Sequence, residues 1–173
     1  QSDGYHFDAG PSLFTQPWQI EELFSLASEN IEDYFSYTQV DVVCHYFFEN
    51  GKTLKTYADT EKLKEEFSNK LGEPMENVSA YLQRAENLYE NVGKIFLNHS
   101  LHKRKTWMHK RIFKAIRHTK PAYLFKSLHR YNSDRFKTSE AVQLFNRFAT
   151  YNGSNPYAAP AMLSLIQIGR AHV

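Results

Sequence analysis

Cysteine is nearly absent from this sequence of 173 residues: Cys44 is the only one, which excludes an internal disulfide framework and a zinc site built from cysteines. The seven glycines include no G-x-G-x-x-G cluster, so the sequence carries no fingerprint for a dinucleotide pyrophosphate. No apolar run reaches about eighteen residues, the length from which a membrane-spanning helix is predicted. A G-x-x-x-x-G-K-[ST] phosphate loop is missing, and no serine has an evident His and acid companion, so nucleotide hydrolysis and nucleophilic hydrolysis are unsupported.

Acidic residues are missing from one stretch of the chain. Residues 1–90 contain 17 of the 19 Asp and Glu. Residues 91–133 contain no Asp or Glu but have 11 Lys or Arg and five His. Such a block produces a positive local field that attracts phosphate on lipids or nucleic acid. Aromatic residues are plentiful, with 13 Phe and 11 Tyr, and they suit the walls of an apolar cavity as well as a core.

The hydrophobic pattern predicts an α+β fold, a β-hairpin sheet with a large helical insertion. Val, Tyr and Phe are frequent from Thr38 to Phe48, Asn50-Gly51 is a strong hairpin-turn signal, and Lys52 to Tyr57 returns as a second strand. A first helix is predicted from Pro17, with Ile20, Leu23, Phe24 and Ala27 on one face, and a second over Thr60–Leu71 with Asp59 as its N-cap. A longer helix is predicted over Met75–Leu97. Two more are predicted from Pro121 towards Tyr131 and after Thr138 or Ser139.

Two segments carry motifs. The first reads GYHFDAGPS over residues 4–12, and the second reads RFATYNGSNPY over residues 147–157, followed by Ala159-Pro160-Ala161. In this order and spacing they resemble the G-aromatic-x-F-D-x-G-P and R-[FY]-A-T-Y-x-G-S-x-P-[YW]-x-A-P-A segments of the phytoene desaturase family of carotenoid desaturases, and the resemblance covers residues 1–166. The second segment is closer in form to the hydroxycarotenoid 3,4-desaturases than to the bacterial phytoene desaturases, and both activities stay open.

The resemblance implies a two-domain, glutathione-reductase-like flavoprotein that uses FAD to introduce C=C bonds into a carotenoid by hydride transfer. It implies a remnant of the FAD-binding domain at 1–17, a substrate and membrane-associating domain at 18–150 with its hairpin at 38–57 and helices over about 60–150, and a loop near flavin and substrate at 151–166. The residues it assigns to cofactor binding are Phe7, Asp8, Gly10 and Pro11. Those it places near substrate or flavin are Tyr151, Asn152, Gly153, Asn155 and Pro156. It assigns no catalytic acid or base.

The two ends of the sequence resemble cuts, so we expect an internal fragment that would not hold FAD unaided. The chain opens on a strand-like stretch without Met, and the family usually continues Ile-Pro-His where Ile166 here precedes Gln167. Residues 168–173 match the translation of a common sequencing adapter, and we expect them not to be native.

The basic block alternates cations with apolar residues, a pattern typical of a helix on an anionic membrane surface, with a plain solvated face as the alternative. The residues predicted to dock are Lys103, Arg104, Lys105, Trp107, Lys110, Arg111 and Phe113. The expected location is cytoplasmic, peripheral on the inner face of the cell membrane, with a polyene carotenoid as substrate and no nucleic-acid partner. The alternative is a non-catalytic basic helical module that binds anionic membrane or RNA. His99 and His102 have no Asp, Glu or Cys nearby, so no metal site is predicted.

Overall fold

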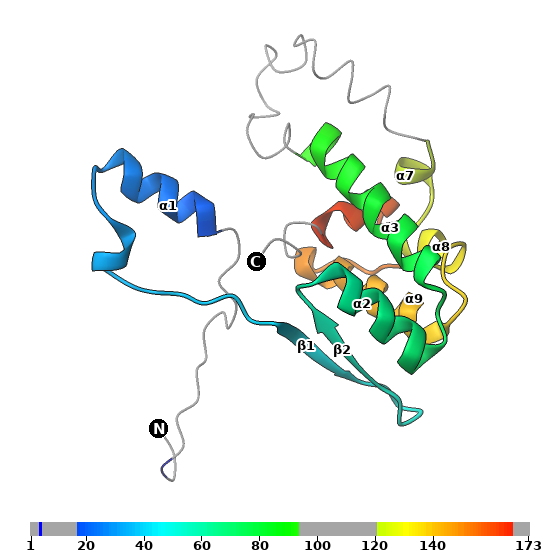
Figure 1. Ribbon diagram of the computed structural model, residues 1–173. Coiled ribbons are helices and arrows are strands. Elements are labelled where there is room, and N and C mark those ends of the chain that lie inside the picture. The colour runs from blue at the N-terminus through cyan, green and yellow to red at the C-terminus, as the bar shows by residue number, and fades with distance from the viewer. Residues whose placement is uncertain (1–3, 5–16, 94–120, 168–173) are drawn as a thin grey trace.

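The structure is a computed structural model that describes residues 4, 17–93 and 121–167. Within these residues, a two-stranded antiparallel sheet is combined with short α-, π- and 3-10 helices (Figure 1). The predicted α+β class is confirmed for this part of the chain. The proposed cofactor residues at positions 7, 8, 10 and 11 and the predicted docking residues between 103 and 113 lie outside the described residues.

The hairpin is formed by β1 (Val42–Phe47) and β2 (Thr53–Tyr57). Gly51 has φ +80°, which favours glycine, and the Asn50 side chain accepts a hydrogen bond from the Lys52 N–H at 3.1 Å. The Asn-Gly turn is thereby confirmed.

The first strand is shorter than the sequence predicted. It begins at Val42 rather than Thr38 because Val42 pairs with Tyr57, the last residue of β2. The Asp41 carbonyl still accepts from the Ala58 N–H at 3.0 Å, and among the described residues the strand pairing does not continue before it. A bulge follows between Val42 and Cys44, and it adjusts which side chains face the helices.

The helix predicted over Thr60–Leu71 is confirmed as α2 (Thr60–Glu66) continued by a π-helical turn, η2 (Phe67–Leu71). Asp59 caps it, since its carboxylate accepts a hydrogen bond from the Lys62 N–H at 2.8 Å. Gly72 ends it in the left-handed conformation at φ +73°.

Helix α3 (Met75–Leu88) is followed by a second π-helical turn, η3 (Tyr89–Gly93). Val78, Ala85 and Leu88 recur on its buried face at helical spacing. The rest of the predicted helix, to Leu97, lies outside the described residues.

The single helix predicted from Pro121 towards Tyr131 is wrong: the chain forms α7 (Pro121–Phe125) and α8 (Leu128–Ser133). At the joint, the Lys126 carbonyl accepts from the Ala161 N–H at 2.9 Å, and the Leu128 N–H donates to the Ala159 carbonyl at 2.8 Å. The Lys126 carbonyl and the Leu128 N–H are therefore bonded to another segment, as in a β-bridge, and cannot form the hydrogen bonds of a continuous helix. The Ser127 hydroxyl then caps α8.

Helix α9 (Ser139–Asn146) runs into two 3-10 segments, η4 (Arg147–Asn152) and, after the turn, η5 (Ala161–Gln167). Glu73 lies at the start of α9 and is fully buried. Its carboxylate accepts hydrogen bonds from the Lys137 N–H at 2.9 Å and the Thr138 N–H at 2.8 Å. An acidic side chain from the loop before α3 thus satisfies the N–H groups of the two residues that lead into α9, Thr138 being its N-cap.

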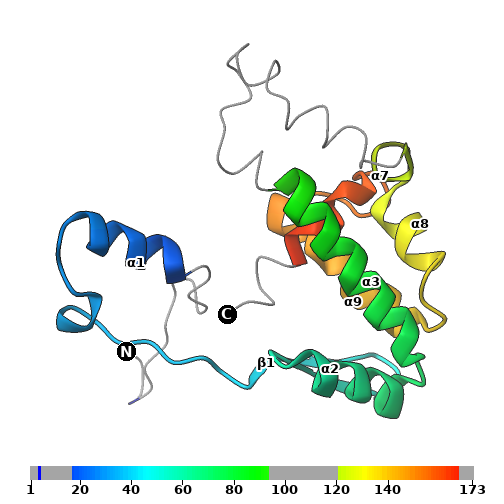
Figure 2. The ribbon, with the colours of Figure 1, turned by 45° about the horizontal axis from the view of Figure 1, so that its top comes forward.

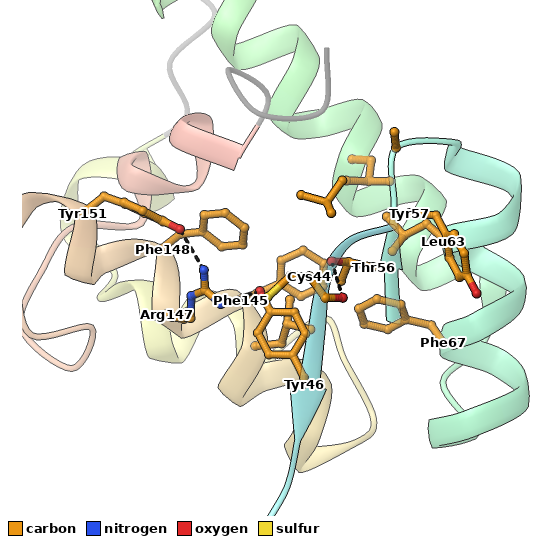
Figure 3. A pocket seen from close by; sticks show the side chains of 14 residues that line it. Cys44, Tyr46, Thr56, Tyr57, Leu63, Phe67, Phe145, Arg147, Phe148 and Tyr151 are labelled. Atoms are coloured by element: carbon orange, nitrogen blue, oxygen red, sulfur yellow. Dashed lines mark hydrogen bonds between the residues drawn. The ribbon is translucent and has the colours of Figure 1, made fainter. Parts of the chain in front are cut away.

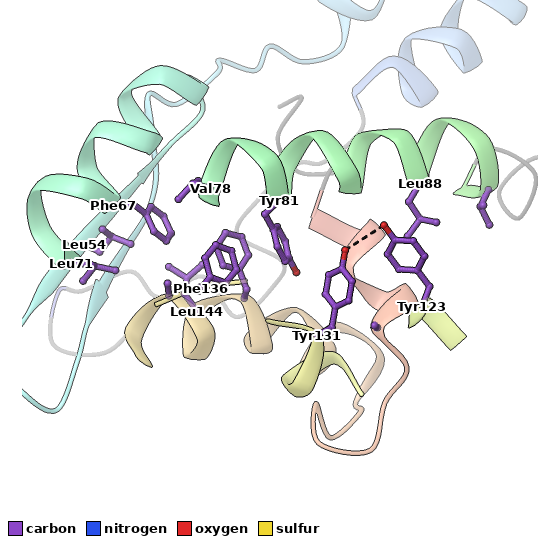
Figure 4. Close-up of a cluster of buried hydrophobic side chains, with 14 residues drawn as sticks. Leu54, Phe67, Leu71, Val78, Tyr81, Leu88, Tyr123, Tyr131, Phe136 and Leu144 are labelled. Carbon is purple, nitrogen blue, oxygen red and sulfur yellow. Dashed lines mark hydrogen bonds between the residues drawn. The ribbon is translucent and has the colours of Figure 1, made fainter. Parts of the chain in front are cut away.

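The core lies between α3 on one side and α8 and α9 on the other (Figure 4). The Phe136 and Phe145 rings stack at 4.5 Å, and the Tyr81 ring lies 4.6 Å from Phe145. The Tyr81 hydroxyl donates to the buried Asn132 side chain at 2.7 Å. Large aromatic rings therefore fill this core, and the hydroxyl of the buried Tyr81 is hydrogen-bonded.

Helix α1 (Pro17–Leu26) and the short η1 (Ile31–Asp33) lie apart from this body in both ribbon views (Figures 1 and 2). None of the α1 residues is buried, and Leu23 is 60% exposed. Its apolar face is covered in part by the segment after it, where the Tyr34 ring lies 4.9 Å from Phe24. In the described parts of the chain, no helix is both long and apolar enough to cross a bilayer.

Candidate functional site

A pocket of about 120 Å³ opens between the hairpin, α2, α3 and the end of α9 (Figure 3). Most of its wall is apolar, and no Asp or Glu belongs to the lining of this pocket. The lining residues are Val43, Cys44, Tyr46, Thr56, Tyr57, Ala58, Leu63, Phe67, Leu82, Leu144, Phe145, Arg147, Phe148 and Tyr151.

The Arg147 guanidinium is the cation of this pocket, and it joins two tyrosines from different elements. It donates to the Tyr46 hydroxyl at 2.7 Å and to the Tyr151 hydroxyl at 2.8 Å (Figure 3). A weaker contact reaches the Cys44 sulfur at 3.7 Å. The guanidinium carbon also lies 5.0 Å from the centre of the Tyr46 ring, within cation–π range.

Local structure explains why these side chains meet. Cys44 and Tyr46 are two residues apart on β1, and alternate residues of a strand face the same side. Arg147 is the first residue of η4, a 3-10 segment, and Tyr151 follows four residues later, close enough for its hydroxyl to accept from the guanidinium. The hairpin lies against α9 and η4, which brings the two pairs into contact.

Two groups of the pocket, Tyr46 and Arg147, have pKa values raised above their ordinary values. Burial raises the pKa of Tyr46 above its ordinary value, and this outweighs the opposing effect of the Arg147 charge. Burial lowers the pKa of Arg147, but its hydrogen bonds to Tyr151 and Cys44 more than compensate, so that pKa is raised. With both pKa values raised, Arg147 is a fixed cation at neutral pH and the Tyr46 hydroxyl keeps its proton, so neither group is suited to abstract a proton.

The structure separates the five residues that the sequence placed near substrate or flavin. Tyr151 lines the pocket, whereas Asn152, Gly153, Asn155 and Pro156 form the turn beyond it. Gly153 ends η4 in the left-handed conformation at φ +61°, which favours glycine. The Pro156 carbonyl accepts from the His129 N–H at 2.9 Å, which ties the turn to α8.

The pocket is too small for a dinucleotide, since an engineered cavity of about 150 Å³ holds only a benzene ring. The turn beside it is more open: Asn152, Gly153 and Asn155 are exposed, and a Cβ added at Gly153 would meet nothing within 4 Å. A large planar group could reach this turn but could not enter the pocket. The described residues contain no group of three or more His, Cys, Asp and Glu that could hold a metal.

Sequence reasoning gave no role to Arg147 or to its partners Tyr46 and Cys44 on β1. One signal was available for the arginine, because it is the only charged residue between positions 141 and 157. A lone cation in an apolar stretch indicates a specific partner. The partners themselves could not be found, because they are about a hundred residues away along the chain.

Comparison with known proteins identifies the class of enzyme that this chain resembles. No family model matches the chain. The curated homologues are enzymes that desaturate or oxygenate carotenoids. The predicted resemblance to carotenoid desaturases is therefore confirmed.

Three relatives make the match specific. The chain is 39% identical over 94% of its length to 1-hydroxycarotenoid 3,4-desaturase of Flavobacterium sp. (strain P99-3), of which it covers 33%. It is 28% identical over 98% of its length to 4,4'-diapolycopene oxygenase of Methylomonas sp, covering 34% of that protein, and 26% identical over 95% of its length to hydroxyneurosporene desaturase of Rubrivivax gelatinosus, covering 32%. The chain thus spans about a third of the length of these relatives, and its similarity to these carotenoid desaturases and oxygenases covers nearly all of its own length.

Proposed function

We propose that this chain is part of an FAD-dependent carotenoid desaturase, and that it acts on hydroxylated carotenoids in preference to phytoene. The observation that carries the proposal is the 39% identity to a 1-hydroxycarotenoid 3,4-desaturase over 94% of the chain. The alternative of a non-catalytic basic module is not favoured, because the homologues are enzymes.

The proposed division of labour follows from the chemistry of the pocket. Bound FAD would supply a hydride acceptor, which is the difficult part of a desaturation. The residues of this chain would bind, orient and keep dry a polyene, for which an apolar wall without acids is suited. Tyr46 and Arg147 would retain their protons throughout, so this pocket is proposed to position substrate and not to transfer protons.

The cofactor residues are proposed from the motifs. Phe7, Asp8, Gly10 and Pro11 would contact FAD, and the turn from Asn152 to Pro156 would face the flavin or the polyene. The open surface at Gly153 supports the second assignment. The division into residues 1–17, 18–150 and 151–166 within a two-domain flavoprotein belongs to the same proposal.

The test of the function is expression of the intact gene product in a host that accumulates 1-hydroxycarotenoids. We expect a pigment with a longer conjugated system, seen by chromatography and as a red-shifted absorption, and a purified protein that carries flavin. A parallel host that accumulates phytoene separates the two candidate activities. A protein that leaves both pigments unchanged would overturn the proposed function.

Docking of the basic block on the inner face of the cell membrane is proposed separately. Each basic residue near an anionic surface contributes about 1 kcal/mol. Replacing Lys103, Arg104, Lys105, Lys110 and Arg111 by Gln in the intact protein should therefore lower its flotation with phosphatidylserine vesicles roughly a hundredfold or more. Flotation that is equal for both proteins, or equal on neutral vesicles, would reject this mechanism.

A further inference from the structure

The Arg147 guanidinium has more N–H donors than its contacts among the described residues use. A guanidinium carries five N–H groups, and within the described residues Arg147 donates to the Tyr46 and Tyr151 hydroxyls and weakly to the Cys44 sulfur. The side chain is half-buried beside Phe145 and Phe148. A half-buried cation with spare donors in an apolar pocket is a binding site for an oxygen acceptor.

The volume and the apolar wall of the pocket restrict which ligand can carry the oxygen acceptor. A cavity of about 120 Å³ accepts a group of roughly the size of benzene, which is the branched end of a long chain and not the chain itself. Leu82, Leu144 and Phe148 provide an apolar wall for its carbon atoms. The site thus fits an apolar end group that carries a single hydroxyl or carbonyl oxygen.

We infer that Arg147, held by Tyr46 and Tyr151, binds the oxygen at the hydroxylated end of the substrate and so selects hydroxylated polyenes over hydrocarbon ones. The inference rests on the proposed function and adds the residue that determines specificity. A hydrocarbon end would leave the guanidinium without its acceptor in a partly dry site. Sites built to bond a substrate hydroxyl discriminate against analogues that lack it, and for this half-buried side chain we expect about tenfold to hundredfold.

The test compares Arg147→Met with the wild-type protein on two polyenes of equal length, one with a terminal hydroxyl and one without, presented in the same vesicles. The intact gene product with its bound flavin is used. We expect wild-type kcat/KM to favour the hydroxylated polyene by about tenfold or more. In Arg147→Met the value for the hydroxylated substrate should fall by a similar factor, while that for the hydrocarbon changes less than about threefold.

The outcomes distinguish the inference from the function on which it rests. Wild-type protein that desaturates both polyenes equally well, or an Arg147→Met variant that loses both activities in equal proportion while keeping its flavin and melting temperature, overturns the inference alone. Wild-type protein that desaturates neither polyene overturns the proposed function and the inference with it.

Two further variants keep the test decisive if Arg147→Met does not fold. Tyr46→Phe and Tyr151→Phe retain the rings and remove only the hydroxyls that hold the guanidinium, so each should reduce the preference for the hydroxylated polyene severalfold. Unchanged preference in both would contradict the inference. Arg130→Met is the matched control, because Arg130 is an exposed arginine on α8 that pairs with Asp134 outside the pocket. Its preference should equal that of the wild type.

Discussion

Replacement of Glu73 by Ala should destabilise the chain more than any surface change of the same kind. The carboxylate is fully buried and accepts from the Lys137 and Thr138 N–H groups, the Thr138 hydroxyl and the Asn77 side chain, at 2.7–3.1 Å. A fully buried donor left unpaired costs about 1–3 kcal/mol, and these donors cost less each because Asn77 and Thr138 are half-buried and Lys137 is exposed. An anion at a helix N-terminus contributes about 0.3–2 kcal/mol more. Relief of the buried charge offsets part of this, so we expect a net loss of about 2–3 kcal/mol.

Urea denaturation of the full chain measures this loss, followed by far-UV circular dichroism. Tryptophan fluorescence would be a poor probe, since Trp18 is 40% exposed on α1, away from the core. For a chain of this size the expected loss corresponds to roughly 5–10 °C in melting temperature. Glu65→Ala, at an exposed site on α2, is the control and should stay within about 0.5 kcal/mol. A Glu73→Ala variant as stable as that control would refute the role given to Glu73 at the start of α9.

Three other changes test separate contacts. The pKa of Glu140 is lowered from 4.5 to about 2, first by the Lys52 ammonium at 2.6 Å and then by backbone and amide donors. Its contribution should be complete above pH 4.5 and disappear towards pH 2, so the difference in melting temperature between wild type and Glu140→Gln should shrink over that range; a constant difference would contradict this. Tyr81→Phe leaves the buried Asn132 oxygen without its donor and should cost about 1–3 kcal/mol in urea denaturation; no loss would mean that water replaces the hydroxyl. Gly153→Ala meets no neighbour within 4 Å but keeps φ +61°, so a melt should show a loss of about 1 kcal/mol from backbone strain alone, and a much larger loss would indicate a hidden clash.

The elements that the sequence predicted well are those whose signals are local. The Asn50-Gly51 turn and the Asp59 cap each depend on residues within three positions of one another, and both are confirmed. The helix predicted through Ser127 failed for the opposite reason. Its break is imposed by hydrogen bonds to Ala159 and Ala161, more than thirty residues further along the chain. No pattern around Ser127 itself predicts that partner.

The site divides in the same way. The motif at 147–157 identified Tyr151 and its turn because it is continuous in sequence. Tyr46 reaches Arg147 only through the packing of the hairpin against η4, a contact between residues about a hundred positions apart. The isolated charge of Arg147 could have indicated that a partner was needed, but periodicity cannot say which of the 11 tyrosines supplies it.

The aromatic residues that the sequence offered as either core or cavity wall turn out to serve both, and this decides where the pocket can be probed. Phe145 lines the pocket but also lies 4.5 Å from Phe136, 4.6 Å from Tyr81 and 5.7 Å from Phe67, so its replacement would disturb the core first. Phe148 is half-buried, and its ring lies 6.3 Å from Phe145. Because its contacts with the core are fewer and longer, a change at Phe148 should alter substrate binding at a smaller cost in stability. Loss of activity at Phe145 says little about the substrate unless the melting temperature is unchanged.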